Sequence, residues 1–167
     1  MNYGSVAILR GGRGALAGAT SLGGVVDFRN QGGKGPLTAL LRGEGGSFGN
    51  RRAQARVSGG DAARAGFVSI SGFGQQGFRD HNRQEALRGA GGASFDLGSG
   101  ITLSSGFLWS DSRLELPGPQ KLAQIEAGDR SAQPGNVRGD WVRDASRLRA
   151  QLGVDADFGP TSLAVSG

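Results

Sequence analysis

The chain has 167 residues, enough for one ordinary domain, and 33 of them are glycine, about three times the average usage. With 5 prolines and no G-X-Y period, the composition excludes a collagen-like structure. Basic residues outnumber acidic ones by 19 to 14, and all but Lys34 and Lys121 are arginine. The charges are interspersed, which is more typical of a solvated face than of a polyanion-binding tail.

A glycine-rich stretch at 8–28, ILRGGRGALAGATSLGGVVDF, is the first feature along the chain. One interpretation is a dinucleotide-binding loop, because Gly12-x-Gly14-x-x-Ala17 follows an apolar run, but no amphipathic helix comes after it. Another is an arginine–glycine segment that binds nucleic acid, but RGGRG occurs once, without interleaved aromatic residues. The rest of the chain supports neither interpretation.

Alternation of apolar and polar residues predicts strands from residue 37 onward. It is clearest at 147–158, a run longer than the usual strand of about five or six residues. Residues Ile101, Leu103, Phe107 and Trp109 likewise share one face. The expected strands are 37–46, 52–58, 65–75, 84–97, 101–109, 147–158 and a seventh beginning at 161.

The lengths of the expected turns favour a transmembrane β-barrel over a soluble sandwich. The turns at 59–64, 98–100 and 159–160 are short, whereas those at 77–83 and 115–144 are longer. The first turn, at 46–50, is short too and departs from this pattern. Short turns at one end and long loops at the other, joining long strands with small apolar residues, are typical of such barrels. The fold class is therefore all-β, an antiparallel meander of about seven long strands.

In a barrel the two faces of each strand meet different surroundings. Arg149, Asp155 and Asp157 are expected to face an aqueous or plugged lumen. Phe158 and Trp109, at opposite strand ends, are expected in the two interfacial aromatic girdles.

The segment ILRGGRGALAGATSLGGVVDFRNQGG resembles the C-terminal part of the plug domain of TonB-dependent outer-membrane receptors. The motif of these plugs reads approximately I-E-V-L-R-G-P-x-S-x-L-Y-G-x-x-A-x-G-G-V-I-N-I, and this chain departs from it at Gly12, Ala17 and Asp27. The segments GSFGNRRAQARVSG, GFRDHNR and LELPGP resemble early barrel strands and loops of the same receptors. The matching plug-motif positions include Arg10, Gly11, Gly18, Gly23 and Gly24.

The resemblance implies the C-terminal part of a plug domain at 1–33 and the first strands of an incomplete barrel at 34–167. It implies a strand at 6–10, a short helical turn at 13–17 and a second strand at 23–29 inside the lumen. Arg10 would help to fasten the plug to the barrel, although an arginine at a water-filled lumen surface is an equal alternative. The turns at 46–50, 77–83 and 115–144 would be extracellular.

Two loops are candidates for ligand contact. Phe78, Arg79, Asp80, His81 and Asn82 bring a cation, an anion, an imidazole and an aromatic ring into one short loop. The functional interpretation is contact with an iron–siderophore or similar chelate, and the favoured alternative is a loop held by its own Arg79–Asp80 hydrogen bonds. The segment 115–144 is expected to cover the substrate mouth, with a short helix at 121–127 and Trp141 near the interface.

Residues for catalysis are scarce. The chain has no cysteine and His81 is its only histidine, so the sequence predicts no catalytic triad, no metal site, no cofactor and no enzyme.

The resemblance implies a fragment of an active-transport receptor for a scarce nutrient, a ferric siderophore above all, in a bacterial outer membrane. TonB would bind the N-terminal part that this chain lacks, and lipid and lipopolysaccharide would surround the barrel. No signal peptide is evident in the first residues. The alternative is a small structural or adhesive outer-membrane barrel without a transport role. The sequence does not name the substrate.

Overall fold

The computed structural model describes residues 3–10, 24–30, 33–159 and 162–167, with side chains at 33–159, 163–165 and 167. No helix in these ranges is long and apolar enough to cross a membrane. The elements are β1 Tyr3–Arg10, β2 Gly24–Asn30, β3 Gly35–Gly46, η2 Ser47–Gly49, β4 Asn50–Gly60, β5 Arg64–Gln75, β6 Gln84–Gly98, β7 Ile101–Glu115, α1 Leu122–Glu126, α2 Pro134–Arg138, β8 Val142–Asp157 and β9 Ser162–Ser166.

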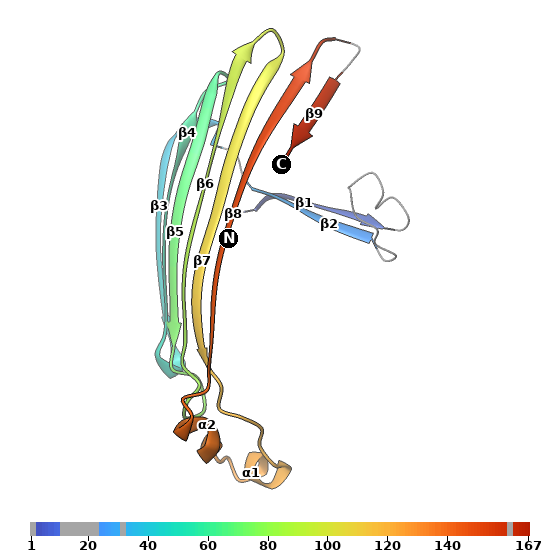
Figure 1. The fold of residues 1–167 in the computed structure, drawn as a ribbon. Helices are drawn as coiled ribbons and strands as arrows, with labels where there is room; N and C mark the ends of the chain where they lie inside the picture. Colours follow the sequence, from blue (N-terminus) through green and yellow to red (C-terminus); the bar gives the residue numbers. More distant parts are fainter. Residues whose placement is uncertain (1–2, 11–23, 31–32, 160–161) are drawn as a thin grey trace.

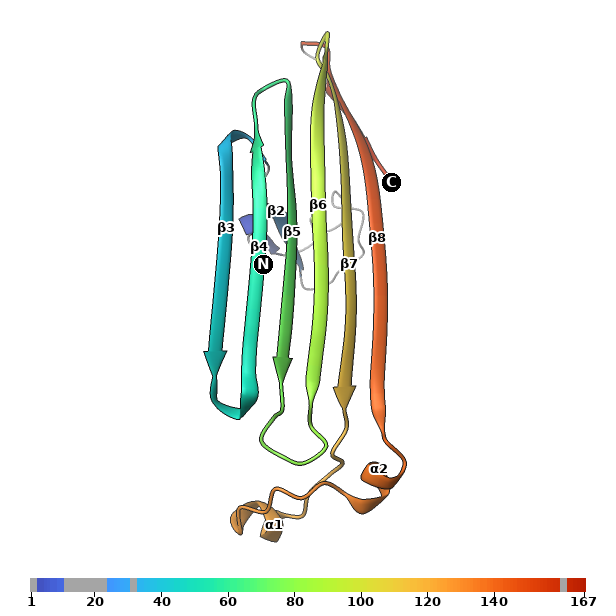
Figure 2. The ribbon, with the colours of Figure 1, turned by 90° about the vertical axis from the view of Figure 1, so that its left-hand side faces the viewer.

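Strands β3 to β9 form one antiparallel sheet in which every strand pairs with its neighbour in the sequence. The order β3-β4-β5-β6-β7-β8-β9 is a pure meander, and the sheet is curved along its strands (Figure 1). The connections β3–β4, β5–β6 and β7–β8 lie at one end, here called the loop end, and the short turns lie at the other, the turn end (Figure 2). Within the described residues, β3 and β9 each pair on one side only.

The predicted meander is confirmed, but several strands run further toward the loop end than the sequence indicated. Trp109 does not end its strand, because β7 continues to Glu115. Apolar alternation stops after Trp109, where Ser110, Asp111 and Ser112 follow. Beyond this level β7 carries mostly polar residues on both of its faces, so this part of the strand lacks the alternation from which a strand is predicted.

The sheet separates its side chains into an apolar face and a polar face. Cross-strand partners Leu41, Ala55, Ile70, Gly89, Trp109 and Leu148 form one row of the apolar face. Leu41 is 84% exposed and Leu148 72% exposed, although both are large hydrophobic residues. An apolar surface this extended on a soluble monomer would be unusual, and it indicates contact with another apolar phase.

Strands β1 and β2 form a separate two-stranded antiparallel sheet in which Arg10 pairs with Gly24. The two strands implied by the plug resemblance are therefore present. The implied helical turn at 13–17 lies outside the described residues, as do Gly11, Gly18 and Gly23. The β1–β2 hairpin lies on the concave side of the large sheet, and in the rotated view it lies behind that sheet (Figures 1 and 2).

Gly33, which lies just before β3, approaches the large sheet closely at β5. A Cβ atom on Gly33 would meet the backbone of Gly66 in β5. Ala65 and Arg56, which lie close by on the polar face, are 8% and 7% exposed, although the sheet is a single layer. The polar face is therefore the concave one, and the apolar face is convex.

We expect Gly33→Ala to destabilise the protein by about 1–3 kcal/mol, because the new methyl group would displace the backbone of Gly66. Gly43→Ala is the matched control, since nothing lies within 4 Å of a Cβ there. The measurement is the urea midpoint of each variant folded in detergent. Equal midpoints for the two variants would contradict the close approach of Gly33 to β5.

Candidate functional site

Two neighbouring rows of the polar face concentrate arginine. In one row Arg42, Arg88 and Arg147 alternate with Gln54, Ser71 and Ser110. The adjacent row, one step toward the turn end, carries Arg56 and Arg149. We call these five residues the arginine band. They come from β3, β4, β6 and β8, so only the strand pairing brings them together.

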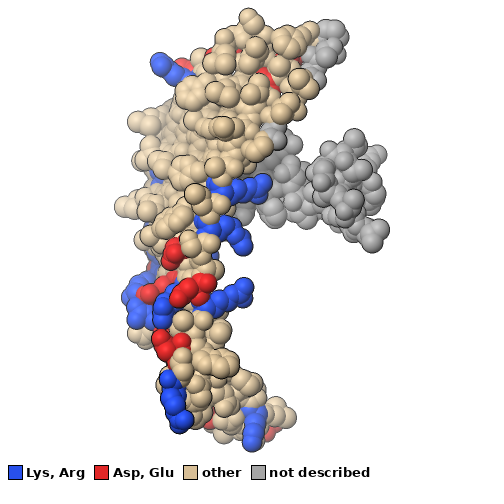
Figure 3. All heavy atoms as spheres, viewed as in Figure 1, with Lys and Arg blue, Asp and Glu red and all other residues tan. Residues whose placement is uncertain are grey.

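Few acidic side chains balance the arginine band. Arg42 pairs with Glu44, with 2.6 Å between Nε and Oε1. The guanidinium of Arg56 lies 4.2 Å from the ring centroid of Phe67. Arg88, Arg147 and Arg149 form no ion pair within the described part of the chain. The band therefore presents positive charge to the concave side, where Figure 3 shows basic side chains projecting.

The turn end of the polar face has the opposite charge. Asp96 and Asp155 lie in one cross-strand row with Thr102 between them, and Asp157 follows two residues later. Asp96 accepts a hydrogen bond from the backbone N–H of Gly98, and Asp157 accepts one from Gly159. The lumen-facing placement expected for Arg149, Asp155 and Asp157 agrees with this polar face, which is basic near its middle and acidic near the turns.

At the loop end, three connections bind one another. The backbone N–H of Gln76 donates to the carbonyl of Phe48 at 2.8 Å, joining the β5–β6 loop to the β3–β4 turn. The N–H of Asp80 donates to the carbonyl of Arg130 at 2.9 Å, joining it to the β7–β8 loop. The Phe78 ring meets Phe48 edge to face at 5.6 Å, and the Arg130 guanidinium lies 4.6 Å from the Phe78 centroid. These connections form one loop cluster.

Arg79 is the main polar link in the loop cluster. Its guanidinium donates to the carbonyl oxygens of Gly118 at 2.6 Å, Ser131 at 2.8 Å and Pro117 at 3.4 Å. The favoured alternative from the sequence, a loop held by its own Arg79–Asp80 hydrogen bonds, is therefore wrong. Arg79 reaches the neighbouring loop instead, because that loop turns three of its carbonyl oxygens toward the guanidinium.

The other residues of the 78–82 loop are also engaged at the loop end. The His81 Nε2 atom lies 3.1 Å from the carbonyl oxygen of Trp141, and its Nδ1 atom lies 4.0 Å from Glu115. Asn82 is half-buried and lies across a turn from Gly77. Contact of these residues with a ligand stays a prediction. Any ligand would meet a loop whose side chains already contact neighbouring segments.

The β7–β8 loop has internal order of its own. Its helix α1 confirms the short helix expected at 121–127, and α2, which begins with Pro134, was not predicted. The Asp129 carboxylate accepts hydrogen bonds from the backbone N–H of Ser131 at 2.9 Å and from the Ser131 hydroxyl at 3.0 Å. These bonds, with one from Gln124, hold the pKa of Asp129 below its ordinary value.

Chemically, the site offers charge and shape rather than catalysis. No group of three or more His, Cys, Asp or Glu residues suited to a metal ion occurs among the described residues. The concave side carries the guanidinium donors of the arginine band, and the loop cluster lies at the end of the sheet beyond them. Guanidinium groups bind carboxylates, phosphates and other planar or bidentate anions. The arrangement is suited to holding an anionic molecule.

Comparison with solved structures decides the fold. The chain superposes on FpvAI from its complex with pyocin S2 with a TM-score of 0.73 at 18% identity, over 94% of this chain. For Pseudomonas aeruginosa FpvA bound to a heterologous pyoverdine, the TM-score is 0.71 at 18% identity, also over 94% of this chain. The chain has the fold of part of a TonB-dependent siderophore receptor.

A third solved structure gives the same result. The ferripyoverdine receptor of the outer membrane of P. aeruginosa, bound to ferripyoverdine, matches 92% of this chain with a TM-score of 0.67 at 19% identity. The chain spans only 22%, 22% and 21% of these three structures. No family model and no curated protein matches the sequence. The resemblance inferred from the plug motif is thus confirmed as a likeness of fold.

We expect Arg79→Ala to loosen the β7–β8 loop while leaving the sheet intact. Hydrogen bonds from a charged group to carbonyls stabilise by about 1.5–3 kcal/mol, and this change removes three of them. Hydrogen exchange should therefore accelerate at 116–141 and stay constant in β4 and β5. Arg138→Ala is the control, since Arg138 is an exposed arginine of α2 in the same loop. Equal exchange in both variants would show that Arg79 does not brace the loops.

Proposed function

We propose that this chain is a piece of an outer-membrane receptor that actively imports a scarce nutrient, a ferric siderophore, with energy supplied through TonB. The observation that carries the proposal is the superposition of 94% of the chain on a siderophore receptor at a TM-score of 0.73. That match spans both sheets, so it supports a plug segment at 1–33 followed by barrel strands at 34–167.

The two faces of the large sheet support a position in a membrane wall. The convex apolar face would contact lipid, and the concave polar face would contact the plug and the imported molecule. Backbone groups on an open edge have no partners in hydrocarbon, so β3 and β9 require further strands beside them. The alternative, a small self-closing barrel, would need β3 and β9 to pair, and no such pairing occurs among the described residues.

The arginine band supports an anionic chelate as the cargo. Three guanidinium groups of the band, those of Arg88, Arg147 and Arg149, form no ion pair among the described residues, and they favour a ligand that keeps negative charge after it binds the metal. The loop cluster lies at the end of the sheet beyond the band. We therefore assign ligand capture to the loop end, and passage to the polar face. The residues of this chain bind and guide, and we propose no catalytic step.

The membrane placement predicts that arginine is tolerated on one face of β5 and harmful on the other. Ile70 lies on the apolar face and is 52% exposed, and its neighbour Ser71 lies on the polar face. Arg at the lipid-facing centre of a barrel strand costs about 2–4 kcal/mol. In the complete receptor in phospholipid vesicles, Ile70→Arg should therefore lower stability by that amount in urea titrations. Ser71→Arg should cost less, about 1 kcal/mol at most, because its only penalty is repulsion from its cross-strand partner Arg88. Equal loss in both variants would contradict this placement.

The transport role is tested in the complete receptor that contains this segment. Deletion of this segment from the receptor should abolish uptake of the ferric chelate by the cell. The double variant Arg88→Gln, Arg147→Gln should weaken binding of the chelate about tenfold. The matched control is Arg64→Gln, which removes an arginine from the apolar face at the turn end. Unchanged uptake after deletion would overturn the transport role. Equal binding in all variants would overturn the role of the arginine band.

A further inference from the structure

The chain crosses strand β4 immediately before β3 begins. Gly35, the first residue of β3, pairs with Gly60 at the end of β4. Gly33, two residues earlier, lies against the backbone of Gly66 in β5. Because β4 lies between β3 and β5 in the sheet, residues 33–35 must pass over β4 to make both contacts. We call residues 33–35 the crossing segment.

Two buried side chains show on which face of the sheet the crossing segment lies. Ala65 and Arg56 project to the concave face, and they are 8% and 7% exposed. Their chain neighbours Arg64 and Val57 project to the convex face and are exposed. A single-layer sheet cannot bury a side chain by itself, so the cover must come from chain that lies on its concave side. Gly33 is itself buried, and the crossing segment therefore forms part of this cover.

Arg56 is held in a specific position beneath this cover. Among the described side chains it is the only polar or charged one that is buried. Its guanidinium lies 4.2 Å from the centroid of the Phe67 ring, and Phe67 directly follows Gly66 in β5. The ring in turn lies over Gly92 of β6, where a Cβ would come within 3.0 Å of the Phe67 Cε1. Burying a guanidinium costs free energy, and stacking on an aromatic ring offsets part of that cost.

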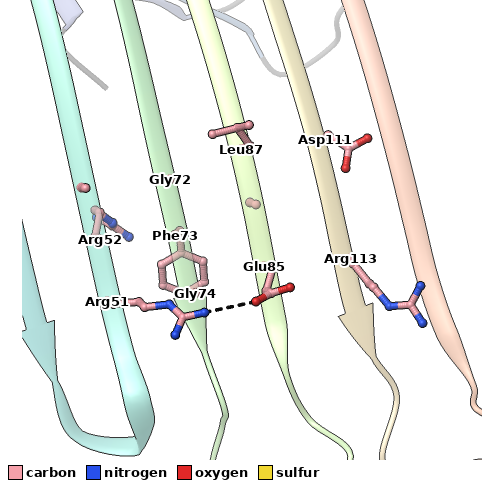
Figure 4. A pocket seen from close by; sticks show the side chains of 11 residues that line it. Arg51, Arg52, Gly72, Phe73, Gly74, Glu85, Leu87, Asp111 and Arg113 are labelled. Carbon is pink, nitrogen blue, oxygen red and sulfur yellow. Dashed lines mark hydrogen bonds and ion pairs between the residues drawn. The ribbon is translucent and has the colours of Figure 1, made fainter.

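Arg52 shows that stacking alone does not bury an arginine in this sheet. It lies on the same strand and the same face as Arg56, and its guanidinium lies 5.4 Å from the centroid of the Phe73 ring. Figure 4 shows these two residues on neighbouring strands. The Arg52 side chain is nevertheless 53% exposed. The two arginines differ in their distance from the crossing segment, which approaches β5 at Gly66, beside the ring that carries Arg56.

We propose that Arg56 positions the crossing segment on the barrel wall, so that the plug part stays attached to β4 and β5 at its C-terminal end while the receptor imports its cargo. The Phe67 ring fixes the guanidinium, and the guanidinium packs beneath the crossing segment. A pull on the plug part then displaces residues before Gly33, and the attachment at β5 bears the load.

The inference rests on the proposed function, because it takes residues 1–33 as a plug part inside a barrel. It goes further by separating two roles of the concave arginines. Arg88, Arg147 and Arg149 are exposed to the lumen and its cargo, whereas Arg56 is enclosed. Removal of the Arg56 guanidinium should therefore change how the crossing segment is held and leave chelate binding unaltered.

The first test measures hydrogen exchange of the crossing segment in the complete receptor in detergent. Arg56→Gln should raise the exchange rate about tenfold, because glutamine supplies no cation to stack on Phe67. Arg52→Gln is the matched control, and it should leave the rate of the crossing segment unchanged. An unchanged rate in Arg56→Gln, or an equal increase in Arg52→Gln, would overturn the proposal.

A second variant, Phe67→Leu, tests the same contact with the charge of Arg56 retained. Leucine keeps an apolar side chain on β5 but provides no ring for the guanidinium. Exchange should again accelerate in the crossing segment and stay constant in β6 and β7. Constant exchange in the crossing segment, or equal acceleration throughout the sheet, would contradict a positioning role for the Arg56–Phe67 pair.

Uptake by cells distinguishes this role from chelate binding. The complete receptor with Arg56→Gln should bind the ferric chelate with unchanged affinity and import it about threefold more slowly per bound molecule. Import at the original rate would overturn the anchoring role. If the unaltered receptor imported no chelate, the proposed function would fail, and the exchange measurements would still decide whether Arg56 holds the crossing segment.

Discussion

Every feature of this protein depends on the fact that its large sheet is a single layer. Of the described side chains only Ala65, Ala132 and Arg56 are buried, and no large side chain is fully enclosed. Among the described side chains, the hydrophobic burial that stabilises an ordinary domain is therefore missing. The strands are held by their backbone ladders, and the two faces require partners from outside: an apolar phase on the convex side and a polar one on the concave side.

The sequence predicted the meander well because the same constraint shapes each strand. Where one face meets an apolar phase, side chains must alternate, and 147–158 shows this alternation throughout. Strand ends were predicted less well where neither face of the strand meets an apolar phase. Beyond Trp109 the strand β7 continues for six residues with polar groups on both faces, so its length is set by pairing with β6 and β8. Likewise, the sequence did not predict α2, a helix of only five residues that begins at Pro134.

The arginine band was harder to predict because the register of strand pairing is what brings its residues together. Arg42, Arg88 and Arg147 are far apart in the sequence, and they share a row only when all the intervening strands pair without slipping. A shift of one residue in any ladder would move part of the row to the opposite face. The contacts of Arg79 could not be predicted from the sequence for a different reason, since its partners are the backbone carbonyl oxygens of residues 117, 118 and 131. Backbone acceptors carry no sequence signal.

The positions of the arginines show how one sheet can serve two surroundings at once. On the concave side they gather midway along the strands, where Arg88, Arg147 and Arg149 have no acidic partners in the described structure. On the convex side this level is apolar. Arginines occur there toward the two ends of the strands, at Arg64 near the turn end and at Arg51 and Arg113 near the loop end, and the last two are paired with carboxylates. Unpaired cations attract a diffusing anion over a long range, whereas ion-paired ones present little net charge. The dyad period of the strands keeps these two sets apart, because neighbouring residues point to opposite faces.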